Sequence, residues 1–108
     1  VLLDATNRLS RAEALRLYTL GSAWFSGEDE RKGRLAAGQF ADFAILGEDY
    51  FTVPDARIAR IESVLTVTGG RIVYAGGPWR SLDPVLPPLL PAWSPVNHFG
   101  GYAGAGAP

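Results

Sequence analysis

The alternation of apolar and polar residues predicts a helix near the start of this chain of 108 residues. Over residues 10–26, apolar side chains recur every three or four positions, as on one face of a helix. The stripe comprises Leu15, Tyr18, Ser22 and Phe25, with Ala14, Leu17, Gly21 and Trp24 beside it. Ser10 and Glu13 have the spacing of a capping box at the start, and Gly27 suits the end. We expect this aromatic stripe to pack against a larger body rather than line a ligand pocket, with a close neighbour at Gly21.

A glycine turn followed by an almost wholly apolar run occupies residues 33–46. Gly33 and Gly38 indicate backbone positions that need positive φ or a close approach. The run 40–46 has the length of a strand, and only Asp42 interrupts its apolarity. Continuous apolarity is typical of a strand covered on both faces. The two layers that cover this strand must therefore come either from this chain or from another body.

Two further strands are predicted at 63–68 and 71–75, because both segments are rich in β-branched residues and are joined by Gly69-Gly70. The expected antiparallel register places Thr68 opposite Arg71, Val67 opposite Ile72 and Leu65 opposite Tyr74. Between the apolar run and this hairpin, residues 47–54 read as a loop. Pro54-Asp55 then suits the start of one or two helical turns.

The composition changes after Gly76, where prolines become frequent. They are Pro78, Pro84, Pro87, Pro88, Pro91 and Pro95, interleaved with Trp79, Leu86, Leu89, Leu90, Trp93 and Phe99. This density disfavours helix and central strand and predicts an extended arm over 78–108. The apolar residues favour an arm packed on its own chain or a partner subunit over a polyproline ligand.

Charge and composition exclude several classes of function. The formal net charge is −1 and no basic stripe is present, which disfavours nucleic acid and anionic membranes as partners. The chain has no cysteine, which rules out disulfides and thiolate sites and fits a cytoplasmic location. No apolar run reaches the length of a membrane span. The start at Val1, without any methionine, indicates a processed or truncated product.

Few residues in the sequence are candidates for chemistry. His98 is the single histidine and lies in the Pro/Gly-rich tail, so no histidine-rich metal site can be built. Asp42 could act as a general base, but its position favours a carboxylate that accepts backbone N–H groups across the glycine turn. The charged run 28–32 lacks calcium-loop spacing and reads as a solvated loop. We therefore predict no catalytic, cofactor-binding or metal-ligating residue.

A series of short motifs nevertheless stands in a distinctive order. They are Ser10-x-x-Glu13-Ala14-Leu15, Tyr18-Thr19, Ala23, Glu28, Lys32-Gly33-x-Leu35, Gly38-x-x-Ala41-Asp42, Asp49-x-Phe51, Pro54 and Val64-x-Thr66-x-x-Gly69-Gly70-x-Ile72-Val73-Tyr74. In this order they resemble the C-terminal end of metal-dependent amidohydrolases, in the branch related to N-acyl-amino-acid deacylases and imidazolonepropionase-like proteins. The resemblance covers residues 9–77.

The resemblance implies a (β/α)₈ barrel elsewhere in the parent enzyme, with zinc or another divalent metal activating water to hydrolyse a C–N bond. It also implies a small β-sandwich built from both ends of the chain. Residues 1–27 would then hold a late helix packed on the barrel, 33–77 the C-terminal part of the sandwich, and 78–108 the packing arm. The His-x-His pair and the other metal ligands of the family are absent from this sequence, and Gly47 replaces a frequent acidic residue.

We therefore expect a mixed α+β fragment, mainly β, that lacks the catalytic site and serves a structural role in its parent. Its partners would be the barrel and the N-terminal sandwich strands of its own polypeptide, with self-association or strand swapping as a further possibility. The alternative is a stand-alone small β-rich interaction module with a proline-rich arm. Uncovered strand edges and apolar surface distinguish the fragment from the module.

Overall fold

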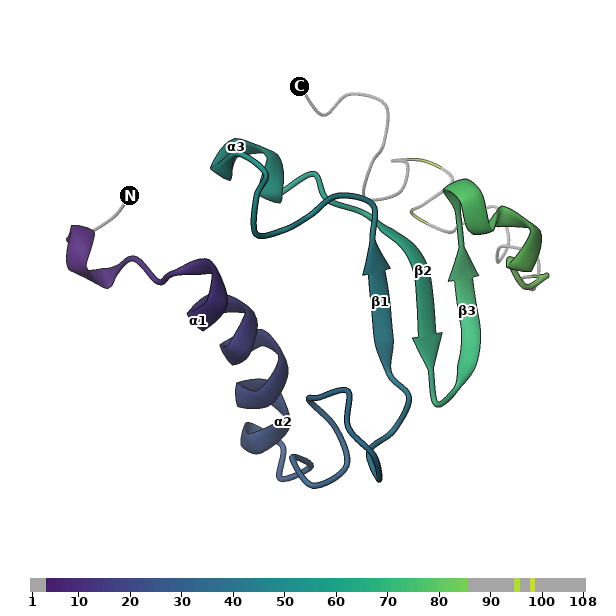
Figure 1. Ribbon diagram of the computed structural model, residues 1–108, viewed down its shortest axis with the longest axis horizontal. Helices are drawn as coiled ribbons and strands as arrows, with labels where there is room; N and C mark the ends of the chain where they lie inside the picture. The colour runs from purple at the N-terminus through teal and green to yellow at the C-terminus, as the bar shows by residue number, and fades with distance from the viewer. Residues whose placement is uncertain (1–3, 86–94, 96–97, 99–108) are drawn as a thin grey trace.

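The computed structural model describes residues 4–85, 95 and 98, and within them the fold is mixed α+β. An N-terminal helical segment stands beside a three-stranded antiparallel sheet (Figure 1). The helical elements are η1 (Ala5–Asn7), α1 (Arg11–Arg16), η2 (Leu17–Gly21), α2 (Ser22–Phe25), α3 (Asp55–Ile58) and η3 (Gly77–Leu82). The strands are β1 (Phe43–Leu46), β2 (Ser63–Thr68) and β3 (Arg71–Ala75). Within the described residues, the helical elements contain more residues in total than the strands do. The expectation of a mainly β chain is therefore not supported there.

The predicted helix is present as one continuous run, α1–η2–α2, and its two ends confirm the sequence signals. At the start, the Ser10 amide donates to Glu13 Oε2 at 2.8 Å and the Glu13 amide donates to Ser10 Oγ at 3.2 Å. At the end, Gly27 adopts φ 70°, its amide donates to the Trp24 carbonyl, and the Glu28 amide donates to the Ala23 carbonyl. This pair of bonds is a Schellman motif, which requires the left-handed residue that glycine supplies.

The middle of the helix differs from the expectation, because η2 is a π-helical segment. Around it, side-chain hydroxyls bond to main-chain carbonyls: Thr19 Oγ1 donates to Leu15 at 2.9 Å, and Ser22 Oγ donates to Leu17 at 3.3 Å. Gly21 ends this segment, and a Cβ placed there would meet mainly Leu17 of the same helix, at 3.4 Å. Within the described residues, the expected close neighbour from another element is therefore not found at Gly21.

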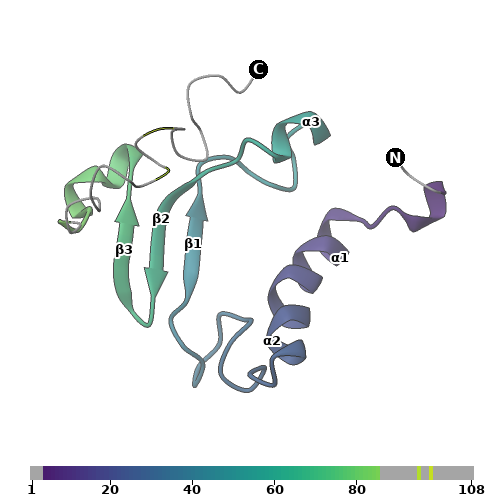
Figure 2. The ribbon, with the colours of Figure 1, turned by 180° about the vertical axis from the view of Figure 1, so that it is seen from behind.

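The sheet has the order β1-β2-β3, with both pairs antiparallel (Figure 2). The hairpin and the pairs Thr68↔Arg71 and Val67↔Ile72 are confirmed. The expected pair of Leu65 and Tyr74 is wrong, because an irregularity shifts the register beyond Val67. Tyr74 therefore pairs with Thr66, and Leu65 pairs with Ala75. The extra residue is Val73, which lies unpaired on β3, as in a β-bulge.

Asp42 has a different partner from the one that its position in the sequence suggested. Its Oδ1 accepts from the Gly69 amide at 2.6 Å, and the Gly70 amide donates to the Ala41 carbonyl at 3.0 Å. The carboxylate therefore stabilises the β2–β3 hairpin turn and not the turn at Gly33 and Gly38. Both hairpin glycines have positive φ, which directs their amides toward residues 41 and 42. Spacing along the chain favoured the nearer turn, whereas the pairing of β1 with β2 brings the farther one into contact.

Replacing Asp42 by alanine is expected to lower the free energy of unfolding by about 1 kcal/mol, because the Gly69 amide loses a charge-assisted hydrogen bond at an exposed site. Asp42→Asn keeps an acceptor oxygen and is the matched control, with a smaller loss. Urea unfolding followed by circular dichroism measures both variants. An unchanged free energy of unfolding in Asp42→Ala would contradict this role for the carboxylate oxygen.

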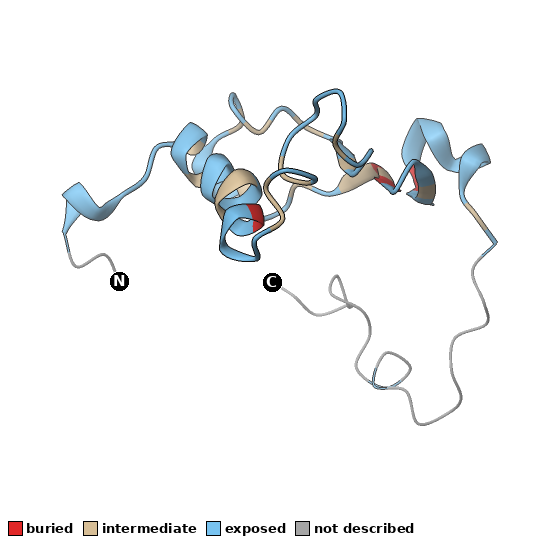
Figure 3. Cartoon of the chain, turned by 90° about the horizontal axis from the view of Figure 1, so that it is seen from below, coloured by how far each residue is buried: buried red, intermediate tan, exposed pale blue. Residues whose placement is uncertain are grey.

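The core is small and lies on one face of the sheet. Leu65, Val67 and Ala75 are buried, and Phe43 and Ile72 pack against them. Figure 3 shows that most other described residues are exposed or intermediate. β1 runs from a partly buried Phe43 to an exposed Leu46, so the two-sided cover expected for this strand is not supplied by the described residues.

The first described part of the proline-rich arm is helical and not extended. η3 carries Pro78 in its first turn, where a missing amide hydrogen costs no helical bond. The Ala75 amide donates to Asp83 Oδ1 at 2.8 Å, which fixes the chain after η3 against the end of β3. Apart from residues 95 and 98, the remainder of the predicted arm beyond residue 85 lies outside the described residues.

Candidate functional site

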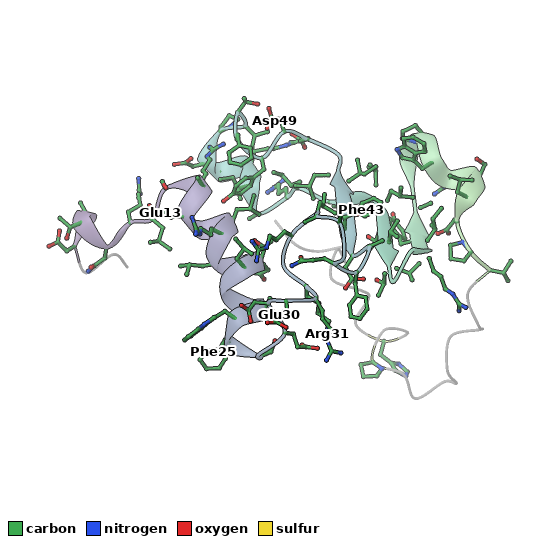
Figure 4. All side chains as sticks on the ribbon, turned by 60° about the horizontal axis from the view of Figure 1, so that its bottom comes forward. Glu13, Phe25, Glu30, Arg31, Phe43 and Asp49 are labelled. Carbon is green, nitrogen blue, oxygen red and sulfur yellow. The ribbon has the colours of Figure 1, made fainter. Side chains whose placement is uncertain are left out.

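The helix presents most of its apolar stripe to solvent. The exposed fractions of Tyr18, Trp24 and Phe25 are 84%, 71% and 88%. Figure 4 shows Phe25 pointing away from the rest of the chain, whereas Phe43 lies within the sheet. An open apolar groove lies along the helix, lined by Leu9, Glu13, Arg16, Leu17, Leu20 and Gly21. We call the exposed residues Leu17, Tyr18, Trp24 and Phe25 the aromatic face.

The opposite side of the helix packs on the chain itself, and sequence reasoning missed it. Ala23 is the buried helical residue there, with an exposed fraction of 6%. Gly33 lies against it: a Cβ built on Gly33 would stand 3.0 Å from Ala23 Cβ and 3.2 Å from Leu20 Cα. Gly33 also has φ 99°, so both expectations for this glycine are confirmed. Gly38 has φ 87° with open space around it.

Arg11 is a second residue that the sequence did not single out. Its guanidinium donates to the carbonyls of Tyr50 (2.6 Å) and Val53 and to Asp55 Oδ1 (2.7 Å). In return, the Tyr50 hydroxyl donates to the Arg11 carbonyl at 3.1 Å. Three acceptors around one guanidinium match its planar fork of donors. This cluster joins the start of α1 to the loop before α3.

The residues considered for chemistry are not brought together. Asp42 is exposed and bonded to the hairpin turn, and His98 is exposed in the tail. In the charged run 28–32, Lys32 pairs with Glu28 at 2.8 Å. Among the described residues, no group of three or more histidine, cysteine, aspartate or glutamate side chains could hold a metal ion.

Several carboxylates are nevertheless held in their charged form by local partners. The Arg11 guanidinium lowers the pKa of Asp55 by hydrogen bonding and by its charge. Hydrogen bonds from Ser10 lower the pKa of Glu13, and a hydrogen bond from Lys32 is the main cause of the lowered pKa of Glu28. Asp55 and Glu13 are exposed, and Glu28 is partly exposed. Glu13 stabilises the start of the helix, Asp55 stabilises the Arg11 cluster, and Glu28 stabilises the loop after the helix.

We expect acid to destabilise the fold through these carboxylates. Each folded-state pKa lies below the ordinary value, 3.8 for aspartate and 4.5 for glutamate. The stabilisation is therefore complete above those values and is lost as the pH falls below them toward the folded-state pKa. Tm measured between pH 7 and pH 3 should fall, and the triple variant Glu13→Gln, Glu28→Gln, Asp55→Asn should show a smaller fall. A Tm that stays constant to pH 3 would exclude this linkage.

Comparison with known proteins identifies the family. The sequence profile described as "Amidohydrolase family" matches residues 1–74, a span that includes the helix, β1, β2 and nearly all of β3. The chain belongs to the amidohydrolase family. The Bacillus subtilis (strain 168) protein named "Putative amidohydrolase YtcJ" is 40% identical to it over 62 residues.

The matched region covers 57% of this chain and 12% of the length of that amidohydrolase relative. The match therefore spans only a small share of that relative's length. No solved structure matches the chain. None of the helices in the described part is both long and apolar enough to cross a membrane.

Proposed function

We propose that this chain is the C-terminal structural part of a metal-dependent hydrolase that acts on carbon–nitrogen bonds other than peptide bonds. The observation that carries the proposal is the exposed aromatic face on a chain of the amidohydrolase family. Contiguous apolar surface of this kind marks an interface with another body. Burying a side chain such as Phe25 contributes roughly 1.5–3 kcal/mol, so a covering body would stabilise the helix substantially.

In this proposal the helix at 11–25 is a late helix packed on a (β/α)₈ barrel that precedes the chain. The match to a small share of the relative's length supports a much larger parent. Zinc or another divalent metal would be held in the barrel, and no step of the reaction is assigned to residues of this chain. The branch related to N-acyl-amino-acid deacylases and imidazolonepropionase-like proteins is the one that the motif order favours.

The sheet would form the C-terminal portion of a composite β-sandwich. β1 supports this role, because it is an edge strand with an apolar sequence and no proline or charged residue between Phe43 and Leu46. Edge strands of independent domains are normally protected by such residues or by covering elements. N-terminal strands of the same polypeptide are the proposed partners of this edge. A stand-alone interaction module would bury its helix and protect this edge, so we do not favour that alternative.

The decisive experiment compares the 108-residue chain with the longer polypeptide encoded by its gene. The longer polypeptide is expected to bind zinc or another divalent metal, measured by elemental analysis, and to hydrolyse N-acyl amino acids. The chain alone is expected to bind none and to hydrolyse none. Metal-dependent amidase activity of the chain alone would overturn the proposal. An initiator codon immediately before Val1 would also overturn it, as would a longer polypeptide that binds no metal.

The aromatic face provides a matched test within the longer polypeptide. Trp24→Ser together with Phe25→Ser should lower Tm strongly, because two buried aromatic side chains would be lost from the contact with the barrel. Glu30→Gln and Arg31→Gln, at exposed positions of the loop after the helix, form the control pair and should leave Tm nearly unchanged. Equal Tm values for the two double variants would show that the face stays in solvent.

A further inference from the structure

The helix and the sheet are attached to each other at two places. Within the described residues, α1, η2 and α2 make no contact with any strand. Figures 1 and 2 show the helix standing apart from β1, with the loop after α2 leading from its C-terminal end to β1. The position of the helix relative to the sheet is therefore set by these two connections, which we call the polar joint and the glycine joint.

The polar joint is the cluster around Arg11 at the N-terminal end of the helix. It holds the start of α1 on the loop that leads to α3 through Tyr50, Val53 and Asp55. The side chain of Arg11 is 24% exposed, whereas that of Asp55 is 78% exposed. Two of the three acceptors of the Arg11 guanidinium are main-chain carbonyls. The polar joint therefore depends on the conformation of the loop more than on the ion pair with Asp55.

The glycine joint lies at the other end, where the loop after α2 folds back on the helix. Gly33 packs there against Ala23 and Leu20 without room for a side chain. The loop is closed by Gln39, whose Nε2 donates to the Asp29 carbonyl at 3.0 Å and whose Oε1 accepts from the Arg34 amide at 3.1 Å. The contact of Gly33 with the helix is steric, and it lies close to the loop that joins the helix to β1. The helix can therefore rotate about this contact.

We propose that the polar joint is a latch, which holds the helix at a fixed angle to the sheet and, when opened, lets the helix swing about the glycine joint. The latch fixes the orientation of the aromatic face relative to the free edge of β1. Two bodies that bind these two surfaces would thus be aligned by Arg11.

Spin labels can test the latch, because the chain has no native cysteine. Ala12→Cys on α1 and Arg71→Cys on β3 place labels at two exposed positions. The distance distribution between the labels is measured by pulsed electron paramagnetic resonance in the chain diluted with unlabelled chain, which suppresses signals between molecules. Arg11→Met should shift and broaden this distribution. Arg11→Lys should have an intermediate effect, since an ammonium cannot reproduce the planar fork of donors.

Arg16→Met is the matched control, because Arg16 is on the same helix and its side chain has no hydrogen bond or ion pair among the described residues. It should leave the distribution unchanged. Asp55→Asn should have a smaller effect than Arg11→Met, because both carbonyl acceptors remain. Hydrogen exchange of the β2–β3 amides should stay slow in every variant. An unchanged distribution in Arg11→Met, or loss of protection in the hairpin, would overturn the latch.

Discussion

Replacing Gly33 by alanine is expected to lower the free energy of unfolding by about 2–6 kcal/mol. Two independent costs add at this residue. A φ of 99° is strained for any residue with a Cβ, at about 1–3 kcal/mol. The new Cβ would also stand 3.0 Å from Ala23 Cβ and 3.2 Å from Leu20 Cα, and overpacking of this kind costs about 1–3 kcal/mol. Urea unfolding of the chain, followed by circular dichroism, measures the total.

Gly38→Ala is the matched control for this prediction. Gly38 has a comparable φ of 87°, but nothing lies within 4 Å of the position of an added Cβ. Its loss should therefore reflect backbone strain alone, about 1–3 kcal/mol. If both variants lose the same free energy, the contact between Gly33 and the helix does not contribute to stability. The difference between the two variants thus isolates the steric part of the glycine joint.

Truncating Leu65 to alanine is the second substitution with a large expected effect. Leu65 has an exposed fraction of 7% and shares the small core with Val67 and Ala75. A buried leucine replaced by alanine typically costs about 2–5 kcal/mol, through lost transfer free energy and the cavity that remains. Few other buried residues can compensate within the described part of the chain, so the hairpin itself should open. Hydrogen exchange of the β2 and β3 amides and urea unfolding measure this.

Val73→Ala is the control for the core prediction. Val73 is 42% exposed and is the unpaired residue at the register shift of β3. Its truncation should cost less than about 0.5 kcal/mol, as is usual for substitutions at the surface. Similar losses at positions 65 and 73 would show that the sheet is stabilised on both faces rather than around Leu65.

Local signals in the sequence were sufficient to predict most of the secondary structure. The capping box, Gly27 and the hairpin glycines each act through bonds within a few residues, and all are confirmed. The β-bulge at Val73 was missed because alternation cannot show where one extra residue is accommodated. The π-helical segment was missed for a similar reason, since its apolar spacing is close to that of an α-helix. The contacts of Arg11 span 39 to 44 residues and left no local signal.

The surfaces of the chain show a different limit of prediction. The sequence indicated that the aromatic stripe would be covered, whereas in the structure it is exposed and the side at Ala23 and Gly33 is buried. Hydrophobic periodicity identifies which residues favour burial, but it does not say whether the covering body belongs to the same chain. The absence of a metal-binding cluster among the described residues concerns this chain alone and leaves the proposed metal of the parent to experiment.

The sequence by itself determined the helix with its two caps, the hairpin turn and the membership of the amidohydrolase family, whose profile matches residues 1–74. These features depend on short spacings, which are preserved in the order of residues. Only the tertiary structure decided that Asp42 bonds to Gly69, that Val73 shifts the register, and that Arg11 and Gly33 attach the helix to the rest of the chain. The physical reason is that these features depend on how one element lies against another, and this geometry exists only once the strands and loops have packed.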